Sequence, residues 1–509
     1  MAEPQSLHAN STQQTDHASP WRVWSVLFAV AFVLYAATAN RGAQWQDSGF
    51  HILRVVTGES VHPLGLALSH PLHHWLGRFV ASWDLFQPCF AVTLVSALAA
   101  AVAVANVYGC VLTLTRRQTA ALLAAGSLGL AHTFWQMATL AETYTLVAAL
   151  LSAECWCLAA YASTRRRGYL WAMVLFNGLG ISNHLLASLT TPVLVFVVLQ
   201  AVWKREVRLG DVGIGLGLWL LGSIPYIALV AAEMARTGEA LETLRSALFG
   251  QSFSDEVLNT TLSPGMLLIG VGFVVLNFPN LLLPAAAYGL VRAGRCGVPG
   301  LARRALLAGL VIHLCFVARY NIVDQHTFFL PAYVLLSIFG GVGFAMMLRW
   351  QRRQTRGVGL MTAVATLALT PILYTLVPAV ARRFDVLSDV QRNKPYRDDY
   401  VYIFTPWSVV ERSAERMSRQ AVELAGDRGL ILVEDPMAEF AIRYQAIRAG
   451  ADDVQIISEV NPETIADAVD QGRPIVLVPA RADAPRTVPP AGLWKRVGDL
   501  YVLTSGTSD

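Results

Sequence analysis

Long apolar stretches separated by short polar loops run through the first three quarters of the sequence. A helix needs about 20 mostly apolar residues to cross a bilayer. Eleven candidate spans are present, at 21–39, 88–114, 119–134, 141–163, 168–183, 187–203, 212–231, 265–291, 305–319, 328–348 and 357–380. Because the third and fifth are short, the pattern predicts ten to thirteen spans. The stretch 265–291 is interrupted by polar residues and proline at 277–280, which predicts a broken helix or two half-spans.

The pattern changes after residue 385, where short apolar runs alternate with amphipathic stretches. The predicted strands cover 430–433, 454–457, 474–478 and 500–503, and the predicted helices cover 408–425, 436–449 and 462–471. Such alternation predicts a small three-layer α/β domain with a mainly parallel sheet over 385–509. The strand end at 434–436 is positioned to contact a ligand. No glycine-rich phosphate loop follows it, so no nucleotide is assigned, and acceptor recognition and capping of the bundle both remain open as roles.

Composition and charge agree with a membrane protein. The 509 residues are 54% hydrophobic and 15% charged, against about 25% charged in a soluble domain. Arginines and lysines gather in alternate loops, at 116–117, 165–167, 204–208, 292–304 and 349–356, whereas the loops 135–141, 183–187 and 320–327 contain none. The positive-inside rule therefore predicts a cytoplasmic amino terminus and an outer location for everything after about residue 381. Residues 1–20 are polar and predict a disordered cytoplasmic tail. The basic loops explain the pI of 8.7, so no nucleic-acid partner is predicted.

The first outer loop, residues 40–87, is unusually polar for a segment beside a bilayer. Ionisable groups in such a place are costly unless they face water, a cavity or a ligand. Its apolar residues have helical spacing, which predicts one or two amphipathic helices lying in the outer interface. Asp47 is expected just before the first of these helices, with Ser48 as an alternative N-cap. A purely structural role for Asp47 as an N-cap is therefore one interpretation.

Histidines and carboxylates far apart in the sequence fall in the same outer layer. Eight of the eleven histidines lie there, and the layer also holds candidates for binding and catalysis. The histidines are His51, His62, His70, His73, His74, His132, His184 and His326, and the other polar residues are Asp47, Gln136, Glu142, Tyr144, Asn183, Arg319, Tyr320, Asp324, Gln325 and Tyr333. Any one of them alone is best explained as an interfacial side chain reaching the headgroups. Together they predict a cavity assembled from several loops.

Five short motifs in this layer carry a resemblance to a known family. They are Asp47-Ser48-Gly49; His70-Pro71 with Leu76-Gly77; Glu142-Thr143-Tyr144-Thr145-Leu146; Gly178-Leu179 with His184; and Tyr320 to Asp324 with Leu330-Pro331-Ala332-Tyr333. In this order they resemble the GT-C superfamily of membrane glycosyltransferases that use lipid-linked sugars. The sequence is most similar to a bacterial family of multispan proteins related to a eukaryotic protein O-mannosyltransferase. The resemblance covers residues 20–380. It implies a GT-C-like catalytic domain of about eleven spans over 21–380, in the bacterial cytoplasmic membrane.

The resemblance implies transfer of a sugar from a polyprenyl phosphate to a hydroxyl of a protein or an envelope glycan on the outer face. Asp47 is the expected general base for the acceptor hydroxyl. The leaving phosphate needs cationic or hydrogen-bond donors, and the candidates are Arg319, His184 and His70. The candidates for sugar binding or support are Ser48, His51, Glu142, Tyr144, Asp324 and Tyr320. Phe50 stands where the family usually has glutamate. No cofactor or metal ligand set is predicted, and dependence on a divalent metal is left open.

Two other function classes were weighed against the enzyme. A transporter or flippase of lipid-linked sugars would show polar groups at the bilayer midplane on repeated segments, and the sequence indicates neither a repeat nor a midplane charge. A non-catalytic scaffold for the outer domain gives no reason for the outer polar cluster. The sequence therefore favours an enzyme but does not name its sugar, lipid carrier or acceptor.

Overall fold

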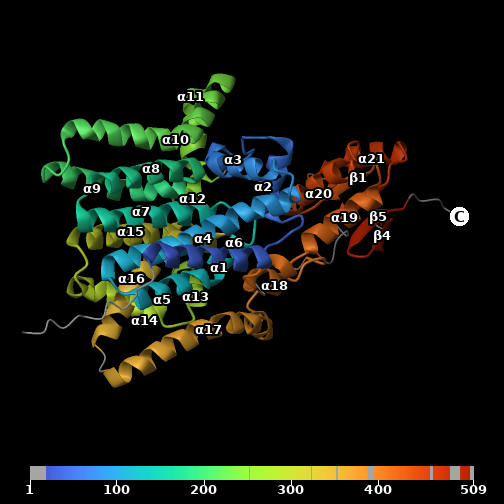
Figure 1. The fold of residues 1–509 in the computed structure, drawn as a ribbon. Helices are drawn as coiled ribbons and strands as arrows, with labels where there is room; N and C mark the ends of the chain where they lie inside the picture. Colours follow the sequence, from blue (N-terminus) through green and yellow to red (C-terminus); the bar gives the residue numbers. More distant parts are fainter. Residues whose placement is uncertain are drawn as a thin grey trace, which may run out of the picture.

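The computed structural model describes residues 19–250, 253–322, 324–350, 353–387, 394–458, 462–481 and 493–504. Nearly all of the predicted amino-terminal tail lies outside these residues. The larger part is a helical bundle (Figure 1). Its elements are α1 (Pro20–Thr38), α2 (Gln46–Thr57), η1 (Leu66–Leu68), α3 (Pro71–Ala81), α4 (Pro88–Thr115), α5 (Gln118–Gly129), α6 (His132–Ala138), α7 (Tyr144–Thr164), α8 (Arg167–Asn183), η2 (Leu185–Thr190), α9 (Thr191–Trp203), α10 (Leu209–Thr237), α11 (Ala240–Phe249), α12 (Ser254–Leu258), α13 (Pro264–Asn277), α14 (Leu282–Arg292), η3 (Ala293–Cys296), α15 (Gly300–Arg319), η4 (Gln325–Phe329), α16 (Leu330–Trp350) and α17 (Arg353–Arg383).

The helices follow the predicted apolar stretches closely. Among the described residues, eight helices are long and apolar enough to cross a membrane, or nine if a bent pair counts as one span. The bent pair is α13 with the helix that begins at Leu282, and the two halves meet at 108°. The predicted break at 277–280 is therefore present. The predicted spans 119–134 and 168–183 correspond to α5, which has 12 residues, and α8, which has 17.

Small residues allow the buried helices to approach closely. The apolar window of the span formed by η4 and α16 is buried along its whole length. A Cβ atom at Gly289 would lie 2.0 Å from the carbonyl oxygen of Phe339, and one at Gly343 would lie 1.8 Å from that of Ala285. Glycine at both positions brings the backbones of α14 and α16 into contact. Such packing of small residues is typical of helices in membranes, where no hydrophobic effect drives them together.

One carboxylate contradicts the expectation that no charged group lies inside a span. Glu154 is in the middle of α7 and is 6% exposed. Its Oε2 atom accepts hydrogen bonds from Thr190 Oγ1 at 3.1 Å and from Asn177 Nδ2 at 3.5 Å. The prediction of no midplane charge was wrong, because the partners that satisfy this carboxylate lie on η2 and α8, beyond the reach of a local pattern.

The carboxy-terminal residues form a five-stranded sheet preceded by short helices. The elements are α18 (Asp399–Phe404), η5 (Ser408–Val410), α19 (Ser413–Ala425), β1 (Leu430–Val433), α20 (Pro436–Ala449), β2 (Gln455–Ile457), α21 (Pro462–Asp470), β3 (Ile475–Val478), β4 (Trp494–Val497) and β5 (Leu500–Leu503). The strand order is β2-β1-β3-β5-β4. Residues of α19 and α20 pack with Ile431 and Val476 on one face, and residues of α21 pack with Leu430 and Leu477 on the other. The predicted three layers are present.

The sheet is mixed rather than mainly parallel. β1 pairs in parallel with β2 and β3, whereas β5 is antiparallel to both β3 and β4. The sequence did not indicate β4, because its exposed Lys495 and Arg496 hide the apolar pattern of a strand. β4 and β5 form a tight hairpin whose turn contains Gly498, with φ of 62°. A two-residue turn joins only antiparallel strands.

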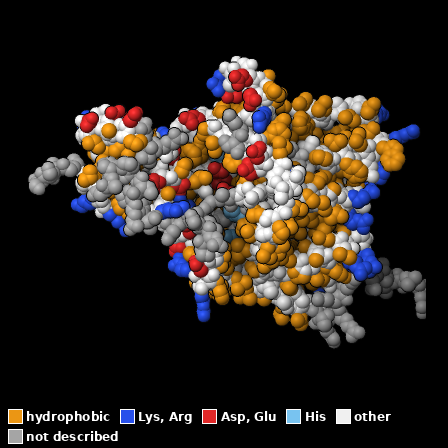
Figure 2. Space-filling model, turned by 180° about the vertical axis from the view of Figure 1, so that it is seen from behind, with side chains coloured by type: hydrophobic (Ala, Val, Ile, Leu, Met, Phe, Trp, Pro, Cys, Tyr) orange, Lys and Arg blue, Asp and Glu red, His pale blue; other side chains and the backbone are white. Residues whose placement is uncertain are grey.

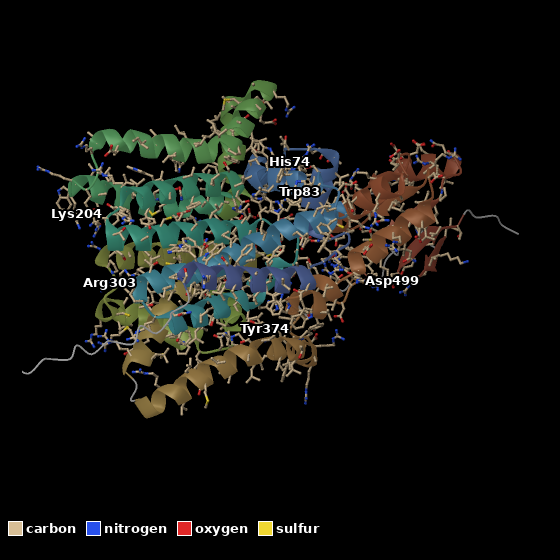
Figure 3. The ribbon with its side chains drawn as sticks, in the orientation of Figure 1. His74, Trp83, Lys204, Arg303, Tyr374 and Asp499 are labelled. Carbon is tan, nitrogen blue, oxygen red and sulfur yellow. The ribbon has the colours of Figure 1, made fainter. Side chains whose placement is uncertain are left out.

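The basic loops and the sheet lie at opposite ends of the bundle. Lys204 and Arg303 are at one end, and Asp499 of the sheet lies beyond the other (Figure 3). We call these the basic-loop end and the sheet end. His74 and Trp83 of the first polar loop lie toward the sheet end (Figure 3). The polar loop and the carboxy-terminal residues therefore meet on the same side of the bundle.

Candidate active site

A cavity of about 800 Å³ opens where the bundle meets the carboxy-terminal residues. Acidic and histidine side chains are visible in a recess between the bundle and the carboxy-terminal part (Figure 2). The cavity is lined by residues of α2, α6, the link between α6 and α7, α13, η4 and α18. Its polar and ionisable lining residues are Gln46, Asp47, Ser48, His132, Thr133, Gln136, Glu142, Tyr144, Asp324, His326, Thr327 and Tyr402. Segments from both ends of the chain thus build one site.

Asp47 lies in the first turn of α2 and does not cap that helix. The N-cap residue is Trp45, the helix begins at Gln46, and no side-chain capping hydrogen bond is present. Gln46 has a φ of 55°, a backbone conformation that is strained for a residue other than glycine. Such strain persists only where surrounding contacts hold it, and it is frequent in active sites. The two predicted interfacial helices exist as α2 and α3, but the predicted N-cap roles of Asp47 and Ser48 were wrong.

Three carboxylic acids line the cavity, namely Asp47, Glu142 and Asp324. The Ser48 hydroxyl donates a hydrogen bond of 2.6 Å to Glu142 Oε1. Burial raises the pKa of the Asp47 carboxyl, and the nearby Asp324 carboxylate raises it further. Burial also raises the pKa of Glu142, the charge of Asp47 adds to the rise, and the Ser48 hydrogen bond opposes it. A carboxylate whose pKa is raised toward neutrality is a stronger base than a free one, while still being ionised at moderate pH.

The structure brings Ser48, Glu142, Tyr144 and Asp324 to Asp47, as the sequence predicted. In the described part of the chain, no cluster of three or more His, Cys, Asp or Glu suited to a metal ion is found. Glu142 and Asp324 come from the motifs at 142–146 and 320–324, so the glutamate missing at Phe50 is not the only possible second acid. The Phe50 ring instead packs against His62, with ring centroids 4.3 Å apart.

His51, His70 and His184 lie in a row behind the cavity wall. The ring centroids of His51 and His70 are 5.6 Å apart, those of His70 and His184 are 4.7 Å apart, and His184 contacts Tyr144, which lines the cavity. Burial lowers the pKa of His184 to about 4. These imidazoles are therefore neutral at physiological pH. None of the three is among the cavity-lining residues.

Hydrogen bonds fix which ring nitrogen of each neutral imidazole carries the proton. His184 Nδ1 accepts from the Leu186 N–H at 3.1 Å, so its proton is on Nε2. His70 Nδ1 lies 2.8 Å from the Asn183 carbonyl oxygen, which can only accept, so the proton of His70 is on Nδ1. His70 also has a φ of 44° at the start of α3. In this state His70 has no free N–H for a phosphate, so its predicted donor role does not fit this geometry.

Arg319 does not reach the cavity. Its Nη1 atom donates to the carbonyl oxygens of Val257 at 2.6 Å and Asn259 at 2.5 Å, and the guanidinium stacks on Phe316. It lines a separate hollow of about 370 Å³ together with residues of the segment 255–266. Tyr320 is likewise outside the cavity and packs on Phe328, with centroids 4.7 Å apart. The predicted place of Arg319 in the donor-phosphate site is not what the structure shows, because its donors are used by the loop before α13.

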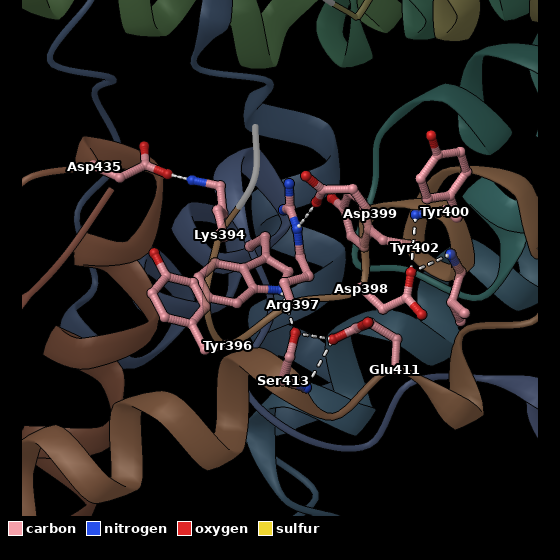
Figure 4. Close-up of polar contacts among 12 residues, drawn as sticks. Lys394, Tyr396, Arg397, Asp398, Asp399, Tyr400, Tyr402, Glu411, Ser413 and Asp435 are labelled. Carbon is pink, nitrogen blue, oxygen red and sulfur yellow. Dashed lines mark hydrogen bonds and ion pairs between the residues drawn. The ribbon is translucent and has the colours of Figure 1, made fainter. Parts of the chain in front are cut away.

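The sequence did not indicate the contribution of the segment 394–413 to the cavity. Arg397 is buried and its guanidinium lies over the rings of Trp45, at 5.4 Å, and Tyr402, at 4.1 Å. Its Nε donates to Asp399 Oδ1 at 2.6 Å (Figure 4). The Tyr402 hydroxyl donates to Gln46 Oε1 at 3.3 Å. We call Trp45, Arg397 and Tyr402 the Arg397 clamp. The clamp holds the strained residues immediately before Asp47.

Further contacts tie the same segment to the first polar loop. Trp45 Nε1 donates to Ser413 Oγ at 3.1 Å, and Ser413 in turn bonds to Glu411 (Figure 4). Gln136 Nε2 donates to the Tyr402 carbonyl oxygen at 3.0 Å. Lys394 forms an ion pair with Asp435 at the end of β1. The aromatic and charged tract 396–402, between the last span and the sheet, is the sequence signal that could have pointed to this arrangement.

Comparisons with known proteins agree with this architecture. Residues 47–207 match the family model described as the Protein O-mannosyl-transferase TMEM260 N-terminal domain. The structure is similar to that of ArnT from Cupriavidus metallidurans bound to undecaprenyl phosphate, with a TM-score of 0.59, 16% identity, and coverage of 96% of this chain and 99% of that one. The chain has a GT-C fold. The fold that the resemblance implied is therefore confirmed.

A weaker likeness links the chain to AglB, the oligosaccharyltransferase from Archaeoglobus fulgidus. A structure of AglB with an inhibitory peptide and a dolichol-phosphate aligns with a TM-score of 0.46 and 10% identity, over 89% of this chain and 69% of that one. No curated protein matches the sequence. At 16% identity the ArnT structure shows the fold alone, and the chemistry has to be argued from the site.

Proposed function

We propose that this chain is a glycosyltransferase that moves a sugar from a polyprenyl phosphate to an acceptor hydroxyl. The observation that carries the proposal is the group of Asp47, Glu142 and Asp324 in a cavity of about 800 Å³. One wall of that cavity is apolar and is formed by Ile269, Gly272, Phe273 and Leu276 of α13. The exposed side chains around this wall, such as Leu268 and Val271, are apolar as well. A cavity with acids at one side and an apolar, membrane-type wall at the other suits a polar sugar on a lipid carrier.

In the proposed reaction Asp47 accepts the proton of the acceptor hydroxyl. The acceptor oxygen then bonds to the sugar carbon, the bond from that carbon to the phosphate oxygen breaks, and polyprenyl phosphate leaves with the electron pair. The charge of Asp324 keeps the pKa of the base high, and Glu142 and Asp324 can hold sugar hydroxyls. Proton acceptance by such a base typically contributes ~10²–10⁴-fold to the rate.

The leaving phosphate needs donors on the cavity side of the bundle. Lysine and arginine are absent from the described residues that line the cavity, whereas His132 and His326 are present. His132 Nε2 is buried and has no hydrogen-bond partner among the described residues. We assign His132 and His326 to the leaving phosphate, to which an imidazole N–H can donate a hydrogen bond.

The acceptor is a protein or an envelope glycan on the outer face of a bacterial cytoplasmic membrane. This orientation is supported by the arginines and lysines at the basic-loop end and by the cavity at the sheet end. A transporter is not favoured, although Glu154 lies inside a span. The cavity beside Glu154 measures about 30 Å³, enough for about one water molecule, and its carboxylate is already hydrogen-bonded.

The test is sugar transfer by purified protein. Detergent-purified protein is incubated with labelled polyprenyl-phosphate sugars and with envelope protein or glycan from a strain that lacks it. We expect label on an acceptor and an equal amount of released polyprenyl phosphate, both measured by mass spectrometry. The Asp47→Asn protein serves as the control. Folded protein that binds polyprenyl phosphate but releases none from any sugar-loaded form would overturn the proposal.

A further inference from the structure

A second large cavity, of about 760 Å³, runs along the bundle between α1, α3, α4, α7 and α8. Its lining includes Val95 near the sheet end of α4 and Arg116 just after that helix ends. The 21 residue-to-residue steps from Val95 to Arg116 correspond to about 32 Å at ~1.5 Å per residue. That length matches the ~30 Å apolar thickness of a bilayer. The cavity is therefore a lateral groove that crosses the membrane region.

The walls of this groove offer almost no free hydrogen-bonding groups. Asn106 accepts a hydrogen bond from Trp24 Nε1 at 3.3 Å and donates to Ser152 Oγ at 3.3 Å. Trp156 Nε1 donates to Thr113 Oγ1 at 3.0 Å. With these polar groups paired, the groove presents aliphatic and aromatic surface. Hydrocarbon chains match such a surface in polarity.

Arg116, at one end of the groove, has a structural counterpart in Arg165, which has a carboxylate partner. α4 and α7 both end in threonine followed by an arginine in the left-handed conformation, Arg116 with φ of 57° and Arg165 with φ of 58°. Arg165 pairs with Glu206 at 3.3 Å. Within the described part of the chain, no carboxylate pairs with Arg116, which is exposed at the mouth of the groove. An anion from outside the protein can take the place that Glu206 has beside Arg165.

We propose that the groove is a binding site for an anionic phospholipid, with its phosphate at Arg116 and its acyl chains between α1, α4 and α7. The headgroup lies at the basic-loop end, where arginines gather. The phosphate of a polyprenyl donor must instead lie at the sheet end, beside Asp47. The two lipids therefore occupy different sites with opposite orientations, and this proposal does not depend on the proposed transferase activity.

The test compares the lipids that stay bound after extraction. Protein is reconstituted in vesicles of equal parts phosphatidylglycerol and phosphatidylcholine, extracted in mild detergent and examined by native mass spectrometry. We expect one phosphatidylglycerol per chain in the wild type. Arg116→Gln should reduce the preference for phosphatidylglycerol about fivefold, as expected for one cation near a membrane surface. Ala153→Phe, which fills the groove, should abolish retention of both lipids.

Matched controls separate the groove from general effects of charge and size. Arg166 is exposed at the same end but does not line the groove, and Leu199 is 62% exposed on α9. Arg166→Gln and Leu199→Phe should retain lipid as the wild type does. Unchanged lipid preference in Arg116→Gln would overturn the proposal, as would a retained polyprenyl phosphate in place of the phospholipid. Because Arg116 is exposed, its substitution tests the site even if Ala153→Phe loses stability.

Discussion

Replacing Asp47 by asparagine should lower sugar transfer and, at the same time, stabilise the folded protein. Asparagine keeps the size and polarity of the side chain but cannot accept the acceptor's proton. A general base contributes ~10²–10⁴-fold, which corresponds to ~2.7–5.4 kcal/mol of transition-state free energy. Helix capping does not complicate the comparison, because the capping position of α2 is Trp45 and no side-chain capping bond exists there.

The stability effect has the opposite sign because the charge at position 47 is unfavourable in the fold. Burial and Asp324 raise the pKa of Asp47. A group whose pKa is raised on folding stabilises the protein when protonated, and this contribution is lost as pH rises through the folded-state pKa. At pH 8 the wild type therefore carries a cost that Asp47→Asn lacks. Relief of ~1 kcal/mol would raise Tm by about 1 °C for a chain of 509 residues, because the unfolding entropy is ~2.1 cal/mol/K per residue.

Two measurements on the same preparation test this reasoning. Transfer is followed as released polyprenyl phosphate, and Tm is followed from pH 5 to pH 8. We expect the Tm difference between Asp47→Asn and the wild type to grow with pH. Transfer within tenfold of the wild type by a folded Asp47→Asn protein would refute the role of Asp47 as the base. A lower Tm for the variant at pH 8 would refute the claim that its charge is unfavourable.

Four further predictions follow from the geometry. Asp324→Asn removes the charge repulsion that raises the pKa of Asp47, so the acid limb of the pH profile of kcat/KM should move to lower pH. An unmoved limb would contradict the electrostatic coupling between Asp324 and Asp47. Arg319→Ala should lower Tm by several degrees, since hydrogen bonds to a charged group contribute ~1.5–3 kcal/mol, and leave the KM for the lipid donor unchanged; a raised KM at constant Tm would restore its predicted phosphate role. Arg397→Ala should reduce kcat at least about tenfold, and Arg397→Lys should have a kcat between those of the wild type and Arg397→Ala, because lysine cannot stack as a planar group. A normal kcat in folded Arg397→Ala protein would exclude a role of the Arg397 clamp in the reaction. A periplasm-active reporter should work after residue 509 and fail after Arg167, and the opposite pattern would invert the topology.

The helices could be predicted from the sequence because hydropathy is a local property. The apolar stretch 88–114 became α4 (Pro88–Thr115), and the polar break at 277–280 became the bend after α13. The gathering of Asp47, Glu142 and Asp324 was also predictable, because alternation of the spans places their loops at one end. In these cases position along the chain determines depth in the membrane, and depth determines which residues lie in the same layer.

Which residues of the same membrane layer contact one another could not be predicted in this way. Arg319 and Asp324 are five residues apart, yet Asp324 lines the cavity whereas Arg319 bonds to carbonyl oxygens about 60 residues away in sequence. Glu154 was missed for a similar reason, since its charge is offset by Thr190 and Asn177 on other elements. Hydropathy indicates how deep a side chain lies but not in which direction it points.

The Arg397 clamp suggests why the carboxy-terminal residues and the bundle are joined so tightly. The strained backbone at Gln46 costs about 1–3 kcal/mol unless neighbouring contacts hold it. Those contacts come from Tyr402, which bonds to Gln46, and from Ser413 and Arg397, which hold Trp45. The segment between the last span and the sheet therefore holds the two residues immediately before Asp47. Movement of the sheet on binding an acceptor would reach the proposed base through three residues, so acceptor recognition and base positioning would be coupled in this fold.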